Sequence, residues 1–209
     1  MDRFAYPRTY HLPWSPGATS DDKIIRNANQ FANQLIVVTE KRDGENTTLY
    51  ADGYVHARSV DGTGKEYQSW ITRKWREVCW SLDADVRICG ENLFARHSIA
   101  YEDLKSFFEV FGIYKGDLCL NWSDTKLIAS KFGLELVPTL YVGLWDEKVI
   151  RQLCEDVVAR GGEGLVVRNT DSFTTANFSL NVAKYVRANH VTTNEHWTKN
   201  WVPNTLETK

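Results

Sequence analysis

The sequence has no long apolar run and no excess of basic charge. No segment approaches the roughly 20 consecutive apolar residues that a membrane-spanning helix requires, and the first residues lack the apolar core of a signal peptide. The 25 basic and 27 acidic side chains give a formal net charge of -2. Proteins that bind nucleic acid by charge alone are usually more basic, so we expect any such contact to be local. A membrane partner is not expected.

Cysteine is also scarce, and the chain has neither repeats nor low-complexity linkers. The four cysteines show no C-x-x-C pair and no spacing typical of metal sites: Cys79, Cys89, Cys119 and Cys154. This pattern predicts buried, reduced thiols in a cytoplasmic protein. Residues 1–20, rich in Pro, Tyr, Trp and Ser, are expected to pack irregularly on the body. A single domain over 1–209 is expected, because this length suits one substantial core.

Short β-branched runs and turn signals predict more strands than helices. Leu35–Thr39 is expected to be a buried strand, and Asp52-Gly53 is a strong hairpin signal after a second strand over 46–51. The spacing of apolar residues predicts a helix between Tyr67 and Leu82. Other elements are expected as strands at 86–93, 107–114, 118–122, 164–168 and 180–187, and as helices from an N-cap at Ser123 to Gly133 and from Asp146 onward. Hairpins join most of these strands, so the predicted fold class is α+β.

Lys41 follows the first predicted strand within the sequence K-R-D-G, so its backbone is fixed while its tip can face a cleft. A lysine attacks as a nucleophile only when neutral, and with a reference pKa near 10.4 deprotonation at pH 7 costs roughly 4.6 kcal/mol. Nearby cations and partial desolvation reduce that free energy. Arg42 is adjacent, and Arg58, Lys184 and Arg187 are expected to converge on Lys41 in the fold. The short motif alone is equally typical of a surface turn.

Six motifs along the chain carry a resemblance to one enzyme superfamily. In chain order they are residues 41–44 (K-R-D-G), 56–59 (H-A-R-S), 89–93 (C-G-E-N-L), 108–113 (F-E-V-F-G-I), 163–167 (E-G-L-V-V) and 182–187 (V-A-K-Y-V-R). Each motif is weak alone. Together, in this order and spacing, they resemble the covalent nucleotidyltransferase superfamily of ATP-dependent ligases and mRNA capping enzymes. The resemblance implies the ligase adenylation fold, with largely antiparallel sheets and flanking helices around an ATP cleft.

The same resemblance implies a role for each motif residue. Lys41 would attack ATP and carry AMP covalently, Lys184 would reach the α-phosphate, and Glu163 would be the third catalytic residue. Glu163 and Asp43 would hold Mg²⁺ or Mn²⁺, since hard oxygen ligands suit such cations. The other implied nucleotide contacts are Glu40, Asn46 near the leaving pyrophosphate, Arg58 on the nucleotide or a phosphate, Glu91 on the ribose, Phe111 stacked on the purine, and Arg187 on the α-phosphate.

Within the superfamily, Asn46 and the compact aromatic strand look most like RNA ligase 2-type enzymes. Asp43 leans instead towards DNA ligases, and Arg187 lies three residues after Lys184 where a second lysine two residues after is usual. The resemblance implies an ATP-dependent RNA ligase that joins 5′-phosphate and 3′-hydroxyl ends through lysyl-adenylate and adenylylated-strand intermediates. Three alternatives stay open: a minimal DNA ligase, an RNA-capping guanylyltransferase, and a nucleotide-binding module without catalysis.

The chain continues for only 22 residues after Arg187, too few for the OB domain of DNA ligases or the C-terminal helical domain of RNA ligase 2-type enzymes. Such domains clamp the substrate, which is expected to be RNA ends or a nicked duplex. A helper protein or the tail over 188–209 is expected to replace them. The tail carries His190, His196, Trp197 and Trp201. Aromatic residues among basic ones can stack on bases, and a tail docked on the domain is the alternative.

Overall fold

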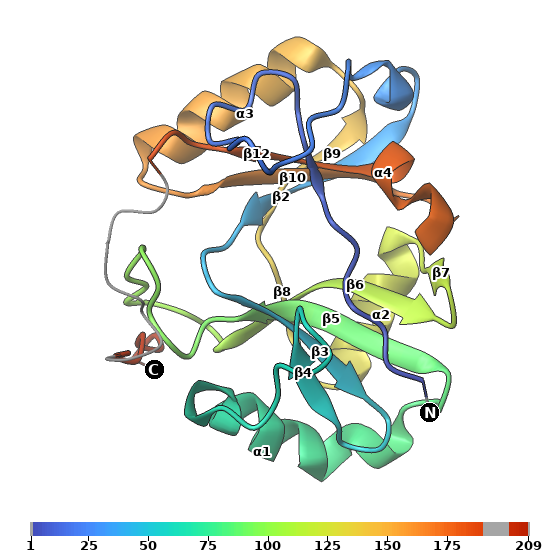
Figure 1. Cartoon of the computed structure of the whole chain (residues 1–209), viewed down its shortest axis with the longest axis vertical. Coiled ribbons are helices and arrows are strands. Elements are labelled where there is room, and N and C mark those ends of the chain that lie inside the picture. Colours follow the sequence, from blue (N-terminus) through green and yellow to red (C-terminus); the bar gives the residue numbers. More distant parts are fainter. Residues whose placement is uncertain (1, 190–200, 209) are drawn as a thin grey trace.

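The computed structural model describes residues 2–189 and 201–208, and its strands form two sheets, one above the other in Figure 1. The five-stranded sheet has the order β1-β12-β10-β2-β9, with bounds Tyr10–His11, Val182–Val186, Gly164–Asn169, Leu35–Lys41 and Thr139–Leu144. The seven-stranded sheet has the order β11-β7-β6-β5-β3-β4, with bounds Phe173–Thr174, Leu118–Cys119, Phe108–Lys115, Val86–Asn92, Glu45–Tyr50 and Val55–Ala57. A further strand, β8 (Glu135–Leu136), pairs with β6.

The pairing of the strands confirms the predicted fold class. The β1–β12 and β6–β8 pairs are parallel, and the other described pairs are antiparallel. The predicted turn at Gly53 joins β3 to β4, and its φ of 78° requires the left-handed backbone that glycine adopts most readily. The protein is therefore α+β with largely antiparallel sheets.

Helices cover the outer face of each sheet. α3 (Glu147–Ala159) and α1 (Ser69–Val78) lie at opposite ends of the molecule in Figure 1. Asp146, where the helix was predicted to start, is the N-cap of α3, and its carboxylate accepts hydrogen bonds from the N–H groups of Lys148 and Val149. The remaining helical segments are α2 (Trp122–Lys131), α4 (Phe178–Asn181) and 3₁₀ turns at 29–31, 66–68, 79–81 and 175–177. No helix within the described ranges is long and apolar enough to cross a membrane.

Each sheet packs an apolar core against its helix. Trp75 of α1 is fully buried in a cluster with Ile88 of β5. Ile150 of α3 is fully buried in a second cluster with Ile36 of β2. Burying one such side chain stabilises the fold by about 1.5–3 kcal/mol. All four cysteines are free and buried, as predicted.

The predicted strand over 118–122 is wrong beyond Cys119. The side-chain oxygen of Asn121 accepts a hydrogen bond from the Asp124 N–H and caps α2, so the helix begins at Trp122. The predicted N-cap at Ser123 therefore lies inside the helix. Asparagine and serine are both common N-caps, and the sequence alone favoured the wrong one of two near neighbours.

Two other differences concern the last third of the chain. The strand predicted over 180–187 begins only at Val182, because residues 178–181 form α4. No strand was predicted at β9, which is the edge strand of its sheet. Val142 and Leu144 of β9 are apolar but exposed. Apolar and polar residues therefore do not alternate along this segment, and the sequence lacks the period-2 pattern that predicts a strand.

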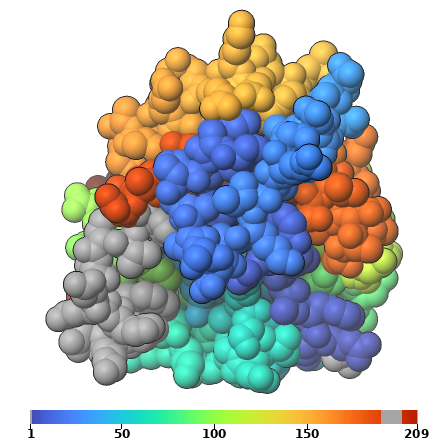
Figure 2. All heavy atoms as spheres, turned by 45° about the horizontal axis from the view of Figure 1, so that its top comes forward, coloured from blue at the N-terminus to red at the C-terminus, as the bar shows by residue number. Residues whose placement is uncertain are grey.

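The chain crosses from one sheet to the other immediately after β2. β2 ends at Lys41 and β3 begins at Glu45, so residues 42–44 make the crossing. The N-terminal residues lie across the face between the two ends of the molecule, in blue in Figure 2. They are largely irregular, and the ring of Tyr6 packs on the body with its centroid 5.0 Å from that of Phe111, as predicted for this aromatic segment.

Candidate active site

A cavity of about 520 Å³ is lined by the end of β2, the crossing to β3 and residues from both sheets. Seven of the residues predicted to bind nucleotide line it: Glu40, Lys41, Asn46, Arg58, Glu91, Phe111 and Lys184. They come from β2, β3, β5, β6, β12 and the loop after β4. The fold therefore brings side chains from distant parts of the sequence into one site.

Lys41 is the last residue of β2, which extends two residues beyond the strand predicted over Leu35–Thr39. Its Nζ donates a hydrogen bond to Glu163 Oε2 at 2.8 Å, and Glu163 is almost fully buried. Burial lowers the pKa of Lys41, but the charges of Glu163, Glu91 and Asp43 outweigh burial and raise the pKa above its usual value. The prediction that converging cations make this amine easier to deprotonate is therefore wrong. Carboxylates dominate its surroundings and favour its ammonium form.

Glu91 and Asn46 occupy paired positions on β5 and β3. Glu91 Oε1 accepts a hydrogen bond from the Gly44 N–H at 3.1 Å, which joins the β2–β3 crossing to β5. Burial raises the pKa of Glu91 to about 8, because desolvation disfavours the carboxylate more than Lys41 favours it. The side-chain oxygen of Asn46 is buried without a hydrogen-bond partner within residues 2–189 and 201–208. That oxygen is available to accept from, or to coordinate, a ligand.

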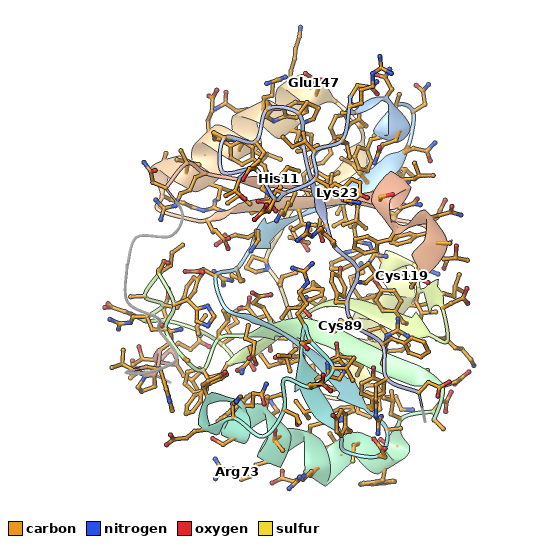
Figure 3. The ribbon with its side chains drawn as sticks, viewed as in Figure 1. His11, Lys23, Arg73, Cys89, Cys119 and Glu147 are labelled. Atoms are coloured by element: carbon orange, nitrogen blue, oxygen red, sulfur yellow. The ribbon has the colours of Figure 1, made fainter. Side chains whose placement is uncertain are left out.

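Lys184 faces an acidic residue from the N-terminal segment. Its Nζ lies 3.8 Å from Asp22 Oδ1, and the same oxygen lies 3.5 Å from His11 Nε2. Burial lowers the pKa of Lys184, with Asp22 opposing this shift and Lys41 adding to it. Figure 3 shows His11 beside the five-stranded sheet, where β1 pairs with β12. An acid from the N-terminal segment thus partly neutralises a cation of the cavity.

Phe111 belongs to the apolar end of the cavity. Its ring is half-buried, and it packs edge-to-face on Tyr6 with the ring centroids 5.0 Å apart. Val166 and Val137 line the same cavity. Arg168 is 5% exposed and donates hydrogen bonds to the main-chain oxygens of Phe111 and Leu120 at 3.5 and 2.8 Å. One cavity thus combines aromatic and apolar walls with cationic groups, which suits a ligand with a base and phosphates.

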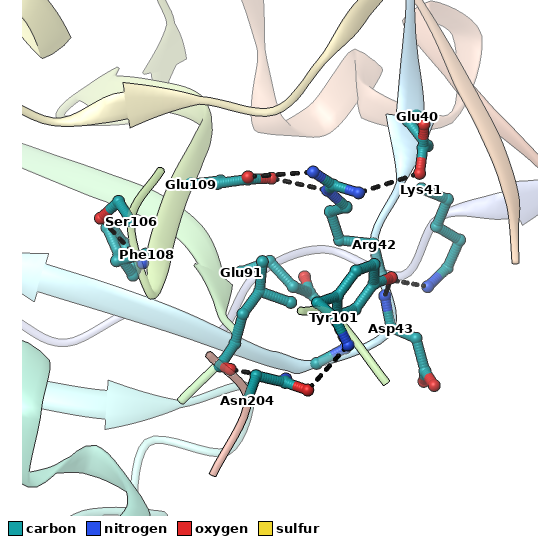
Figure 4. Close-up of polar contacts among 12 residues, drawn as sticks. Glu40, Lys41, Arg42, Asp43, Glu91, Tyr101, Ser106, Phe108, Glu109 and Asn204 are labelled. Atoms are coloured by element: carbon teal, nitrogen blue, oxygen red, sulfur yellow. Dashed lines mark hydrogen bonds and ion pairs between the residues drawn. The ribbon is translucent and has the colours of Figure 1, made fainter. Parts of the chain in front are cut away.

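Arg42 fixes the crossing against both sheets, as Figure 4 shows. Its Nε and Nη2 donate to the two carboxylate oxygens of Glu109 at 2.8 and 3.1 Å, and its Nη1 donates to Glu40 at 3.0 Å. Glu40 also accepts a hydrogen bond from Arg160 at 2.7 Å. Bidentate pairs of this kind set orientation as well as adding energy. The side chain of Glu40 belongs to this network, and its predicted nucleotide contact stays a prediction.

In the described part of the chain, three predicted site residues lie outside the cavity lining: Glu163, Asp43 and Arg187. Glu163 nevertheless contacts Lys41, which lines the cavity. Asp43 Oδ2 accepts hydrogen bonds from the main-chain N–H groups of Ser98 and Ile99 at 2.8 and 2.7 Å. The Arg187 N–H donates to the main-chain oxygen of Glu163 at 2.9 Å. Both residues therefore support neighbours of Lys41, and their predicted contacts with metal and phosphate stay predictions.

The donors for a divalent cation are single oxygens rather than a cluster. Among the residues that the structure describes, no group of three His, Cys, Asp or Glu side chains is suited to a metal. The oxygens that fit are the Glu163 carboxylate and the buried Asn46 amide oxygen. Mg²⁺ commonly takes one or two protein oxygens together with substrate phosphates and water. The donor set fits a cation that binds with a nucleotide rather than alone.

The N-terminal segment supplies cavity residues that the sequence analysis missed. They are Tyr6, Pro7, Arg8, Thr9 and Asp22. The aromatic content of this segment predicted that it packs on the body, but no motif marked it as part of a site. His97, from the loop between β5 and β6, also lines the cavity.

The C-terminal tail is described only in part. His190, His196 and Trp197 lie outside the described residues. The ring of Trp201 packs against Phe94 and Tyr67, with centroid distances of 5.3 and 6.4 Å. For Trp201, the alternative of a docked tail is the one observed.

Comparisons with known proteins give one family and one fold. A sequence model of the family described as RNA ligase matches residues 34–186. An archaeal ATP-dependent RNA ligase has a TM-score of 0.59 and 18% identity, over 88% of this chain and 48% of that chain. A putative ATP-dependent DNA ligase from Aquifex aeolicus has a TM-score of 0.60 and 20% identity, over 88% of this chain and 50% of that chain.

A third solved structure, the Naegleria gruberi RNA ligase with PPi, has a TM-score of 0.56 and 18% identity, over 89% of this chain and 61% of that chain. No curated protein matches the chain by sequence. The chain spans about half the length of the first of these structures. Likeness at such identities shows a shared fold, and it confirms the predicted ligase-type fold.

Proposed function

The chain belongs to the RNA ligase family, and from this membership we propose that it is an ATP-dependent RNA ligase that carries AMP on Lys41. One observation carries the proposal. Lys41 Nζ lies at the end of a paired strand, 2.8 Å from the buried Glu163, in the cavity that Phe111 and Lys184 also line. The residues proposed as nucleophile, purine platform and phosphate-binding cation thus line one cavity.

The proposed reaction has three steps. The Lys41 amine attacks the α-phosphorus of ATP, a nitrogen–phosphorus bond forms, and the α–β phosphoanhydride bond breaks with its electrons leaving on pyrophosphate. AMP then passes from Lys41 to the 5′-phosphate of a strand. A 3′-hydroxyl finally attacks that activated phosphate, which forms the phosphodiester and releases AMP. Lys41 must be neutral for the first step. Loss of the Lys41–Glu163 pair would remove the strongest electrostatic influence that raises the pKa of Lys41, while burial, which favours the neutral amine, remains.

The remaining cavity residues would position the nucleotide. Phe111 would stack on the purine, and Glu91 would accept hydrogen bonds from ribose hydroxyls. Lys184 would bind the α-phosphate as it is transferred. The other proposed contacts are Glu40 on the nucleotide, Arg58 on the nucleotide or a phosphate, and Arg187, from outside the cavity lining, on the α-phosphate.

A divalent cation belongs to the same proposal. Glu163 and Asn46 would hold it, with Asp43 in support, and Mg²⁺ or Mn²⁺ bound there would neutralise charge on phosphoryl oxygens. A Naegleria gruberi RNA ligase variant of the same fold was solved with ATP and Mn. That precedent supports ATP and a divalent cation for this chain.

The proposed substrate is RNA ends or a nicked duplex, and a minimal DNA ligase is the second candidate. The match to the RNA ligase family favours an RNA substrate. Because the putative DNA ligase from Aquifex aeolicus has the same fold, the experiment tests DNA as well. The chain spans about half the length of these structures. Four free cysteines support a reducing compartment such as the cytoplasm.

The test is covalent labelling with ATP that carries a radioactive α-phosphate. Purified protein is first treated with pyrophosphate to remove any bound AMP, then incubated with Mg²⁺ and labelled ATP or GTP. We expect an acid-labile label from ATP, little label from GTP, and none on a Lys41→Ala variant. Nicked RNA and nicked DNA duplexes are then added to the labelled protein. Sealing of RNA supports the first candidate, sealing of DNA alone supports the second, and a folded protein without label contradicts both.

A further inference from the structure

Residues 201–208 follow the last motif in the sequence, and they pack on the loop between β5 and β6. Main-chain hydrogen bonds join the two segments: the Asn204 N–H donates to the Phe94 oxygen, and the Thr205 N–H donates to the Tyr101 oxygen, both at 3.0 Å. Two isolated bridges, Ala95–Pro203 and Leu104–Leu206, extend the contact. The C-terminal segment is therefore part of the packing of this loop.

Asn204 is the polar centre of that contact. Its side chain is 2% exposed. Its Nδ2 donates to the Leu93 oxygen at 2.8 Å, and its Oδ1 accepts a hydrogen bond from the Tyr101 N–H at 2.9 Å. One buried amide thus joins the residue that follows β5 to the middle of the loop. Buried main-chain groups in such positions need their partners, because no water replaces them.

Tyr101 in turn contacts the turn that follows Lys41, as Figure 4 shows. Its hydroxyl accepts a hydrogen bond from the Asp43 N–H at 3.0 Å, and the guanidinium of Arg42 lies 4.9 Å from its ring centroid. The same loop donates two N–H groups to the Asp43 carboxylate, from Ser98 and Ile99. The loop therefore holds both the main chain and the side chain of Asp43.

These contacts form one continuous path from the C-terminal segment to the candidate nucleophile. We propose that Asn204 is a positioning residue for adenylation, which acts through Tyr101 on the turn that follows Lys41. The inference rests on the proposed function and goes beyond the six motifs, since Asn204 and Tyr101 belong to none of them. A shift of the turn moves Lys41 relative to the α-phosphate, and small displacements of a nucleophile slow a reaction strongly.

The first measurement separates rate from binding. Adenylation of pyrophosphate-treated protein is followed over a range of ATP concentrations for the wild type, Asn204→Ala and Thr205→Val. Thr205→Val is the matched control, because it removes one hydrogen bond, to the Glu102 oxygen, between the same two segments. We expect Asn204→Ala to lower the maximal rate about 10- to 100-fold with KM for ATP nearly unchanged. Equal maximal rates for Asn204→Ala and Thr205→Val would overturn the inference.

A double-mutant cycle tests the path through the tyrosine hydroxyl. Tyr101→Phe removes only the group that accepts from the Asp43 N–H and keeps the ring beside Arg42. If Asn204 acts through that hydroxyl, Asn204→Ala in the Tyr101→Phe background lowers the rate by less than about threefold further. Fully multiplicative effects would overturn the proposed path. Circular dichroism and thermal unfolding confirm that each variant is folded at the assay temperature.

Hydrogen exchange keeps the inference independent of activity. We expect amides of residues 42–44 to exchange about tenfold faster in Asn204→Ala than in the wild type or in Thr205→Val. Wild-type protein that takes no label overturns the proposed function, whatever the exchange shows. Wild-type labelling with unchanged exchange in Asn204→Ala overturns the positioning inference alone.

Discussion

Lys41 Nζ and Glu163 Oε2 lie 2.8 Å apart although 122 positions separate the two residues in the sequence. The pairing of β2 with β10 accounts for the contact, because Gly164 lies directly opposite Lys41 in the register. Gly164 also has the close backbone approach that excludes a larger residue, since an added Cβ would lie 1.9 Å from the Tyr185 oxygen. Sheet register and a glycine thus place the carboxylate beside the amine.

We predict that Glu163→Gln lowers the free energy of unfolding by about 1–2 kcal/mol at pH 7, because it leaves a largely buried ammonium without its main counter-charge. The folded-state pKa of Lys41 is raised above 10.5. The stabilisation is therefore complete below that pH and is lost as the pH rises through the folded-state pKa. Urea unfolding at pH 7 and at pH 11 measures both effects.

Glu155→Gln, on the exposed side of α3, is the control for the loss of one surface carboxylate. We expect it to unfold at the same urea concentration as the wild type. Equal stability of Glu163→Gln and the wild type at pH 7 would contradict the prediction.

Glu91 gives a pH dependence of the same sign at lower pH, because its pKa too is raised in the folded protein. Its pKa is about 8 in the folded protein against 4.5 for an ordinary glutamate, so the folded protein keeps a proton that the unfolded chain has released. Stability must then fall as the pH rises from 4.5 to 8. We predict that Glu91→Gln removes this fall, so its stability relative to the wild type increases by about 1–2 kcal/mol between pH 5 and pH 8. The free energy of unfolding of both proteins is measured by urea unfolding at pH 5 and pH 8. A difference between Glu91→Gln and the wild type that stays the same at both pH values would contradict the prediction.

The sequence predicted the parts of the fold and site that depend on local pattern. Leu35–Thr39 carries enough β-branched residues to identify β2, and Asp52-Gly53 identifies the turn that follows β3. The motif residues were found because the resemblance supplied their order. Lys41, Glu91 and Lys184 indeed reach one cavity.

The contacts that the sequence did not predict are tertiary. Asp22 reaches Lys184 only because β1 pairs with β12, and neither residue type nor spacing reports such a pairing. Asn204 reaches Tyr101 through a hydrogen bond that joins residues 103 positions apart. The error in the pKa of Lys41 has the same origin. Its neighbours in sequence include a cation, while its neighbours in space include three carboxylates.

The pair of Asp22 and Lys184 makes a prediction about ATP binding. Asp22 Oδ1 lies 3.8 Å from the amine that would bind the α-phosphate, so the carboxylate competes with the phosphate for that cation. We predict that Asp22→Asn lowers KM for ATP about threefold, which corresponds to the modest energy of a partly exposed pair. Asp21→Asn, at the exposed neighbouring position, should leave KM unchanged. A raised KM in Asp22→Asn would show that the carboxylate positions Lys184 instead of competing for it.

The last prediction concerns the aromatic ring proposed to stack on the purine. Phe111 lies in β6, where its ring packs on Tyr6 and faces the cavity, so stacking and core packing are both open to it. Stacking of a base on an aromatic side chain contributes about 1–3 kcal/mol, so Phe111→Ala should raise KM for ATP roughly 10- to 100-fold. Phe111→Tyr keeps the ring face and should stay within about threefold of the wild type.

Measurement of thermal unfolding beside the adenylation kinetics separates these two roles of Phe111. Phe173 provides the matched control, because it is a buried phenylalanine that lines the same cavity from β11. If Phe111 stacks on the purine, Phe111→Ala raises KM more than Phe173→Ala does for a similar loss of thermal stability. If Phe111 is only a core residue, the two variants lose stability alike and KM rises equally in both, because the loss then follows from packing and not from the base.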